Sequence, residues 1–199
     1  RVHEGPGASP GHIRAYDLNT GEMVWRFNTI PHPGEYGYET WPKDAWKHMG
    51  GANSWAGMTL DESTGIAYIP TGSASYDFWG GNRSGENLFA NSLIALNAKN
   101  GERVWHFQFI HHDLWDRDLP APPNLVEINR NGSKIKAVTQ VTKSGHLFVF
   151  DRLTGEPIYP IEEIPVKSAK LDGEKSWPTQ PLPNSYTPFC KTRIFERSN

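Results

Sequence analysis

Short apolar strands alternate with polar turns along most of this chain, and one strand–turn–strand pattern occurs three times. Each copy contains an apolar-rich strand, an Asp or Asn, a Gly, and a second strand that ends in an aromatic residue. The copies span residues 13–25, 93–105 and 147–159. Asp and Asn side chains hydrogen-bond the backbone of a turn, and Gly adopts the positive φ angles that tight turns need. The pattern therefore predicts a β-hairpin in each copy.

The spacing of the hairpins predicts how they assemble. Long intervals between the copies leave space for further strands, and another turn at residues 61–65 precedes an apolar strand at residues 66–70. Hairpins of one template bury their apolar faces by stacking on one another, and repeated four-stranded units of this kind form β-propellers. We therefore expect an all-β fold, a β-propeller built of four-stranded blades. An open β-sandwich is the alternative, although sandwiches do not require repeated units of one template.

The aromatic residues that end the three copies are expected to pack between adjacent blades, since large aromatics supply much apolar area. They are Trp25, Trp105 and Tyr159. Propellers close with about four to eight blades of about 40 to 50 residues each. The 199 residues of this chain therefore supply about three to four blades, and we expect an incomplete ring.

The last part of the chain has a different pattern. We assign residues 1–165 to the propeller blades and residues 166–199 to a Pro-rich irregular tail. Prolines at several positions of residues 176–183 exclude helix there and favour an extended conformation.

Composition agrees with an all-β fold and excludes some functions. The chain has 19 Gly, 16 Pro and 8 Trp, which is typical of short strands and tight turns. A net charge of −2 gives no attraction for nucleic acid. The single cysteine, Cys190, excludes an intrachain disulfide. No apolar run approaches the roughly 20 residues of a membrane span, and the first residues do not resemble a signal peptide, so we expect a processed or truncated chain.

A dense polar cluster at residues 111–118, His-His-Asp-Leu-Trp-Asp-Arg-Asp, is the strongest candidate for chemistry. It follows a strand-like run at residues 104–110, so it is expected where a strand enters a loop, a frequent location of catalytic groups. The adjacent imidazoles of His111 and His112 point apart on a strand, and neither Cys nor a helical His pair completes a zinc site.

The order of several motifs resembles that of the dehydrogenases that use pyrroloquinoline quinone, and most closely the membrane-type glucose dehydrogenase branch. The motifs are Asn53-Ser54-Trp55, Trp79-Gly80-Gly81-Asn82-Arg83, the cluster at 111–118, and Lys143 ahead of Asp151-Arg152 and Gly155-Glu156. The resemblance covers residues 1 to about 182. It implies a segment of an eight-bladed propeller, with the quinone and a calcium ion near the axis. It also implies oxidation of an alcohol or an aldose sugar, a quinone or cytochrome as electron acceptor, and a periplasmic or other extracytoplasmic location.

The resemblance also implies roles for individual residues. Asp116 matches the family's catalytic aspartate, which takes the hydroxyl proton and contacts the metal. Lys143 matches the cation against the quinone oxygens, and Trp55 matches the indole that stacks under the cofactor. Glu4 matches a glutamate metal ligand, whereas Ser73 stands where the family has an amide ligand. For the neighbouring carboxylates Asp113 and Asp118 we expect local hydrogen bonds to backbone amides.

Two other functions are compatible with the repeats. A non-catalytic propeller could serve as a scaffold for a protein partner, but a scaffold has no reason to gather three carboxylates in one place. A lectin-like β domain could use the tryptophans as sugar platforms, yet it does not account for the repeated hairpins. An incomplete ring would expose blade faces, so we expect the chain to self-associate.

Overall fold

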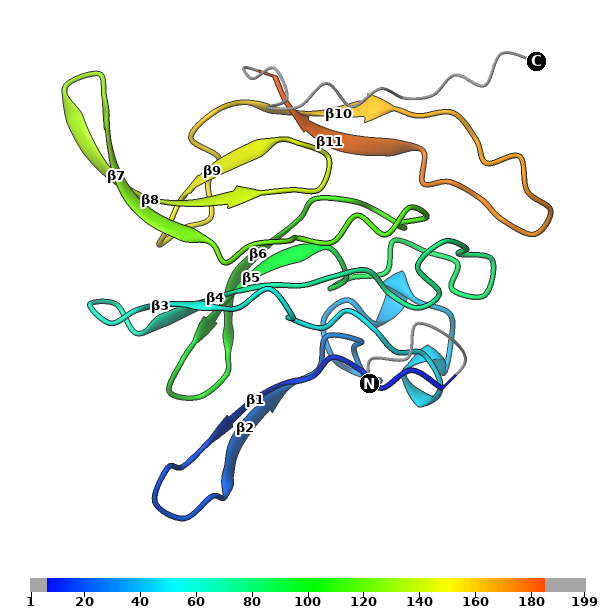
Figure 1. Ribbon diagram of the computed structural model, residues 1–199, viewed down its shortest axis with the longest axis horizontal. Coiled ribbons are helices and arrows are strands. Elements are labelled where there is room, and N and C mark those ends of the chain that lie inside the picture. The colour runs from blue at the N-terminus through cyan, green and yellow to red at the C-terminus, as the bar shows by residue number, and fades with distance from the viewer. Residues whose placement is uncertain (1–6, 185–199) are drawn as a thin grey trace.

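Four antiparallel sheets follow one another as blades in the computed structural model, which describes residues 7–184 (Figure 1). The strands are β1 (Ile13–Tyr16), β2 (Met23–Phe27), β3 (Thr59–Asp61), β4 (Ile66–Pro70), β5 (Ser92–Asn97), β6 (Arg103–Gln108), β7 (Asn124–Arg130), β8 (Ser133–Val141), β9 (Leu147–Asp151), β10 (Ile161–Pro165) and β11 (Thr179–Pro183). Two short 3₁₀ helices, η1 (Tyr38–Thr40) and η2 (Ala45–Lys47), lie between β2 and β3. None of the helices in the described residues is long and apolar enough to span a membrane. The predicted all-β propeller architecture is confirmed.

The sheets are complete to different degrees. Strands β3–β4–β5–β6 form a full four-stranded blade, and β7–β8–β9 form a three-stranded one. The pairs β1–β2 and β10–β11 are two-stranded. Of the predicted hairpins, those at residues 13–25 and 93–105 form as expected. In the third copy, the second strand is reduced to a single bridge between Phe150 and Pro157.

The segment predicted to be an irregular tail contains a strand. Residues 179–183 form β11, which pairs antiparallel with β10 from Ile161 opposite Pro183 to Pro165 opposite Thr179. The extended conformation expected at residues 176–183 is therefore present there, whereas the irregular tail is wrong for these five residues. The division of the chain at residue 165 stays a prediction.

Tryptophans join neighbouring blades in the way the repeat predicted. The Nε1 atom of Trp25 donates to the carbonyl of Ala98 at 2.9 Å, in the turn of the next blade. Likewise, Trp105 Nε1 donates to the carbonyl of Arg152 at 3.1 Å, in the turn of the blade after that. Tyr159 instead has the guanidinium of Arg130, on β7 of its own blade, 5.2 Å from its ring centre, and its packing against the next blade stays a prediction.

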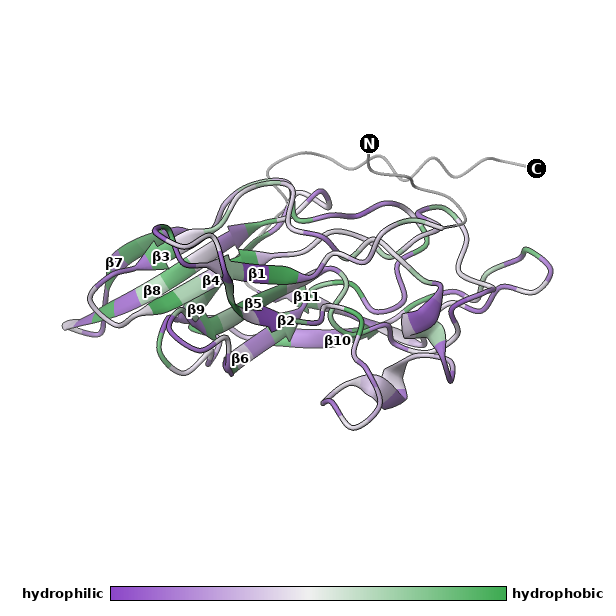
Figure 2. Ribbon diagram, turned by 90° about the horizontal axis from the view of Figure 1, so that it is seen from below, coloured by the Kyte–Doolittle hydropathy of each residue, from purple (hydrophilic) through white to green (hydrophobic). Residues whose placement is uncertain are grey.

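Aromatic side chains fill the space between the second and third blades. Phe109 packs edge-on against Phe148, with ring centres 4.7 Å apart, and Tyr68, Trp105 and Phe150 belong to the same buried cluster. Strand β9 is largely apolar, whereas β10 carries two glutamates (Figure 2). This packing holds the loop after β6, which carries residues 111–118, in a fixed position between blades.

Candidate active site

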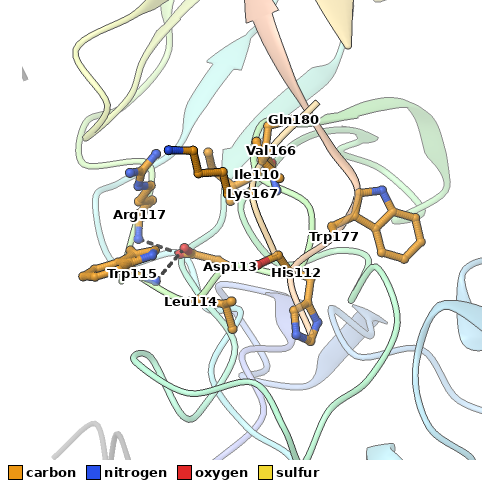
Figure 3. Close-up of a pocket in the computed structure, with 11 residues that line it drawn as sticks. Ile110, His112, Asp113, Leu114, Trp115, Arg117, Val166, Lys167, Trp177 and Gln180 are labelled. Atoms are coloured by element: carbon orange, nitrogen blue, oxygen red, sulfur yellow. Dashed lines mark hydrogen bonds between the residues drawn. The ribbon is translucent and has the colours of Figure 1, made fainter. Parts of the chain in front are cut away.

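Asp113 organises the loop that follows β6. Its carboxylate accepts hydrogen bonds from the backbone amides of Trp115 at 3.0 Å and Arg117 at 2.5 Å, drawn as dashed lines in Figure 3. It also accepts from the Ser73 hydroxyl at 2.5 Å and from the Asn91 side-chain amide at 3.0 Å. The residue is only 3% exposed. Asp113 therefore has the local capping role expected for it, and it ties the loop to the segment that carries Ser73.

The fully buried guanidinium of Arg83 also supports this loop. Arg83, from the motif at residues 79–83, donates to the Asn87 side-chain oxygen at 2.8 Å, to the Tyr76 carbonyl at 2.9 Å and to the Asp113 carbonyl. Burial lowers the pKa of Arg83 to about 10, and the Asp113 charge opposes that change. Arg83 is therefore still a cation at neutral pH, which offsets the charge of the buried Asp113 carboxylate.

The structure brings the three sequence-predicted site residues Trp55, Asp116 and Lys143 together at one cavity of about 270 Å³. The other residues that line the cavity are Gly51, Asn53, Ser73, Ser75, Asp77 and Asp118. Asn53 belongs to a motif noted in the sequence, whereas Ser75 and Asp77 were not singled out. The cavity therefore combines a flat indole, a cation, carboxylates and neutral polar groups.

Lys143 bridges two carboxylates at this cavity. Its ammonium lies 3.0 Å from Asp116 Oδ2 and 2.8 Å from Asp118 Oδ2, and it donates a further bond of 3.0 Å to the Asp116 carbonyl. The second oxygen of Asp118 accepts from the Ser73 amide at 2.6 Å. Asp118 thus accepts a bond from a backbone amide, but from one 45 residues away instead of a local one, and it also pairs with Lys143.

This arrangement shifts the pKa of both Asp116 and Lys143. Burial raises the pKa of the Asp116 carboxyl, and the nearby Asp118 charge adds to this, while the hydrogen bond from Lys143 opposes it. Burial lowers the pKa of Lys143, but its hydrogen bonds to Asp118 and Asp116 outweigh burial, so its pKa is raised overall. Lys143 therefore stays charged at neutral pH, and Asp116 is a stronger base than an ordinary aspartate.

Asp116 adopts an unusual backbone conformation. Its φ angle is 52°, in the left-handed region that costs a non-glycine residue about 1–3 kcal/mol. Its amide donates to the Asp77 carbonyl at 3.1 Å, which helps to hold this conformation. The side chain of Asp116 is one-third exposed, so a ligand in the cavity can reach it.

Trp55 presents its indole to the cavity with 51% of the residue exposed. The Lys143 ammonium lies 5.7 Å from the centre of the indole ring. A Cβ atom at Gly72 would lie 2.5 Å from Asp118 Oδ1 and 3.2 Å from Trp55 Nε1, so glycine is needed where these two side chains approach the backbone. A flat, exposed ring beside a cation is suited to a planar anionic ligand.

The candidate metal ligands are only partly placed. Glu4 lies outside the described residues, and the Ser73 hydroxyl is bonded to Asp113. Within residues 7–184 no group of three or more His, Cys, Asp or Glu side chains is arranged to hold a metal ion. The two adjacent imidazoles diverge: His111 lies between Glu86 and Glu163, and His112 Nδ1 contacts the Gly85 carbonyl.

Comparison with known proteins places this chain in a family. The family described as "PQQ: Glucose/ethanol/alcohol dehydrogenase, beta-propeller domain" matches residues 2–198. Quinoprotein glucose dehydrogenase of Escherichia coli is 41% identical over 174 residues, which cover 86% of this chain and 21% of that protein. Quinate/shikimate dehydrogenase (quinone) of Acinetobacter baylyi is 40% identical over 173 residues, again 86% of this chain and 21% of the relative. The chain thus spans about a fifth of the length of these relatives.

A solved structure shows the same architecture. Quinohemoprotein alcohol dehydrogenase from Comamonas testosteroni superposes with a TM-score of 0.70 at 29% identity, over 93% of this chain and 30% of that one. The family match covers nearly the whole chain, and the sheets and cavity described above lie within it. The chain belongs to the pyrroloquinoline-quinone-dependent glucose/ethanol/alcohol dehydrogenase family and forms part of its β-propeller domain.

Proposed function

We propose that this chain forms the cofactor-facing segment of a dehydrogenase that oxidises an alcohol or an aldose sugar with pyrroloquinoline quinone. The observation that carries the proposal is the convergence of Trp55, Asp116 and Lys143 on one cavity of about 270 Å³. These residues come from three separate loops, and a cation that pairs with two carboxylates at a partly open cavity is ready to interact with a ligand.

The residues at the cavity fit the cofactor. Pyrroloquinoline quinone is flat and anionic, so the exposed indole of Trp55 offers a stacking surface and the Lys143 ammonium offers a positive charge. Asn53 and Ser75 supply neutral polar groups at the cavity wall. When bound, the quinone supplies the electrophilic carbon that takes hydride from the substrate.

Asp116 is the group that accepts the substrate proton. Oxidation of a C–OH group releases hydride from carbon and a proton from oxygen, and the carbonyl double bond forms as both leave. The raised pKa of Asp116, caused first by burial and then by Asp118, makes its carboxylate a stronger base. Lys143 orients this carboxylate through the 3.0 Å contact to Oδ2, and its positive charge would hold the anionic cofactor and favour its reduction.

The proposal also includes a calcium ion as second cofactor, an extracytoplasmic location of the protein, and an electron acceptor as its partner. The Asp116 carboxylate is the only predicted metal ligand within residues 7–184, since Glu4 lies outside them, and oxygen ligands suit calcium. The extracytoplasmic location, the quinone or cytochrome acceptor and the self-association of the chain stay predictions.

The scaffold alternative accounts less well for the site. A protein-binding propeller gains nothing from two carboxylates, Asp116 and Asp118, that are held against one ammonium at a cavity. The cost of holding them there is explained if the cavity binds and acts on a small molecule.

Cofactor binding to the chain itself tests the proposal. We expect pyrroloquinoline quinone to quench tryptophan fluorescence, and Lys143→Gln to weaken binding about tenfold or more through loss of a charge-assisted contact. Lys47→Gln is the matched control, because Lys47, the last residue of η2, forms an exposed ion pair with Asp44 just before that helix and does not line the cavity. Equal binding by both variants would refute the assignment of Lys143.

The role of Asp116 is tested by catalysis. In a preparation that reduces a redox dye with an alcohol or aldose, Asp116→Asn removes the base, and we expect turnover to fall by about 10²–10⁴-fold. Asp44→Asn is the control carboxylate. Turnover that survives in Asp116→Asn contradicts the proposed base.

A further inference from the structure

His111 joins three parts of the molecule through its side chain. Its Nδ1 atom lies 2.7 Å from the Gln108 side-chain oxygen on β6 and 3.0 Å from Glu86 Oε1 in the loop before β5. Its Nε2 atom lies 3.1 Å from Glu163 Oε1 on β10. The imidazole is only 12% exposed. One side chain therefore connects the complete second blade to the two-stranded sheet β10–β11.

The backbone of His111 makes a second connection to the same sheet. Its amide donates to the Gln180 side-chain oxygen at 2.8 Å, and its carbonyl accepts from the Gln180 side-chain nitrogen at 2.7 Å. The Trp177 ring lies 6.0 Å from the imidazole. The sheet β10–β11 thus contacts the residue that begins the cluster at 111–118 through both main chain and side chain.

Both ring nitrogens of His111 face carboxylate oxygens, so both contacts are hydrogen bonds only when the imidazole carries two protons. Burial lowers the pKa of His111, but the bonds to Glu86 and Glu163 outweigh burial and raise the pKa overall. The hydrogen bond from His111 in turn lowers the pKa of Glu86, while burial opposes this. His106, which also faces Glu86, has its pKa lowered to about 4 by burial and by Arg103, so it is neutral near pH 7.

The loop that carries Asp116 begins at this junction. The next amide along the chain, that of His112, donates to the Glu86 carbonyl at 3.0 Å. Asp113 follows and holds the amides of Trp115 and Arg117. Displacement of residue 111 therefore moves the anchor of a loop whose Asp116 is already held in a left-handed conformation.

We propose that His111, as an imidazolium between Glu86 and Glu163, is a positioning residue that fixes the β10–β11 sheet against the loop of Asp116 and so sets the geometry of the cavity. It touches neither the cavity nor a ligand in it, and it acts through the order of residues 112–117. The consequence for catalysis rests on the function proposed above, whereas the effect on the loop does not.

The sign of the pH dependence follows from the raised pKa. The bridge stabilises the loop fully below the ordinary His pKa of 6.5, and this stabilisation is lost as pH rises through the higher pKa that His111 has in the folded chain. At low pH, protonation of Glu86 removes one of the two negative charges that face the imidazolium. The loop is therefore most ordered in the interval between these two titrations.

Nuclear magnetic resonance on the 199-residue chain tests the proposal. The imidazole ¹⁵N signals give the midpoint of His111, which we expect above 6.5. Amide exchange of Trp115 and Arg117, corrected for the intrinsic rate, is expected to speed up by about tenfold across the same midpoint. Glu86→Gln should move the midpoint of both signals to lower pH.

Two further variants complete the experiment. Glu163→Gln makes the same test at a half-exposed position on β10, in case Glu86→Gln does not fold. Glu162→Gln is the matched control, since Glu162 lies on the same strand and contacts Asn184. A His111 midpoint at or below 6.5, or loop exchange that ignores this midpoint, overturns the proposal. If the chain fails to bind the quinone but loop exchange follows His111, the proposed function fails and the positioning role remains.

Discussion

Replacement of Gly155 by alanine tests the contact that joins the second and third blades. Gly155 has a φ of 77°, and a Cβ atom built there would lie 2.6 Å from Cδ2 and 2.8 Å from Cγ of Trp105. Carbon atoms pack at about 3.5–4.0 Å, so the methyl group would push the indole away or distort the turn. The substitution therefore combines a backbone cost with a steric cost.

Gly21 provides a control with the same turn and without the contact. In both turns an Asp side chain accepts from the backbone amides two and three residues later, Asp17 in one and Asp151 in the other. The φ of Gly21 is 72°, and nothing lies within 4 Å of a Cβ atom built on it. Gly21→Ala therefore measures the backbone cost alone.

The magnitudes follow from these two geometries. A non-glycine residue in the left-handed region costs about 1–2 kcal/mol, and overpacking of a well-packed contact costs about 1–3 kcal/mol more. We expect Gly21→Ala to lower the free energy of unfolding by about 1–2 kcal/mol and Gly155→Ala by about 2–5 kcal/mol. Urea unfolding, followed by circular dichroism and by tryptophan fluorescence, gives both values.

Equal losses for the two substitutions would refute the docking of Trp105 on the turn of the next blade. A larger loss for Gly21→Ala would do the same. If Gly155→Ala lowers the slope of the urea transition as well as its midpoint, then the blades unfold separately, and the midpoint of the Trp105-containing blade is the quantity to compare.

Three further substitutions probe the site and its support. Asp118→Asn removes a charge that raises the pKa of Asp116, so the ¹³C titration of the Asp116 carboxyl and the acid limb of turnover should both move to lower pH; movement to higher pH would contradict the electrostatics. Asp113→Asn removes the carboxylate that accepts from the amides of Trp115 and Arg117, together with the charge that most opposes the lowering of the Arg83 pKa, and is expected to cost about 1–3 kcal/mol in urea unfolding, whereas an unchanged stability would contradict the anchoring role of Asp113. Trp25→Phe removes the bond to the Ala98 carbonyl and should cost about 0.5–1.5 kcal/mol beyond lost packing, with an unchanged stability as the contrary result.

Features that depend on neighbouring residues were predictable from the sequence. The turns at Asp17 and Asp151 follow from side chains that bond amides two and three residues away. Asp113 likewise holds amides two and four residues ahead of it, as expected for a carboxylate at the end of a strand. The docking of Trp25 and Trp105 on the following blade was predictable because the template repeats.

Features that depend on pairing between distant residues were not predictable from the sequence. Strand β11 carries Pro181 and Pro183, which lack the amide protons of a ladder, so the sequence indicated an irregular segment. The strand forms because β10 is available as a partner in a two-stranded sheet. Conversely, Pro157 was a usable sign that the third copy would lose its second strand, since it removes a donor at that position.

The same distinction applies within the candidate site. Asp118 was expected to make only local bonds, yet its partners are the Ser73 amide and the Lys143 ammonium, which are 45 and 25 residues away. These contacts arise when three loops converge in space. The pattern of apolar and polar residues along the chain contains no information about that convergence. Ser75 and Asp77 were missed for the same reason, because they reach the cavity through the path of the loop after β4.

The loop at residues 113–118 uses its two supporting cations in different ways. Arg83 is fully buried, and its planar guanidinium is fixed by three acceptors, so it can balance Asp113 but cannot turn toward a ligand. Lys143 is one-third exposed, and its ammonium holds Asp116 and Asp118 at the cavity wall. A bound anion can share the Lys143 ammonium without unfolding the loop. Arg83 therefore supports the loop, whereas Lys143 is available to a ligand. Substitution of Lys143 should for this reason affect ligand binding far more than stability.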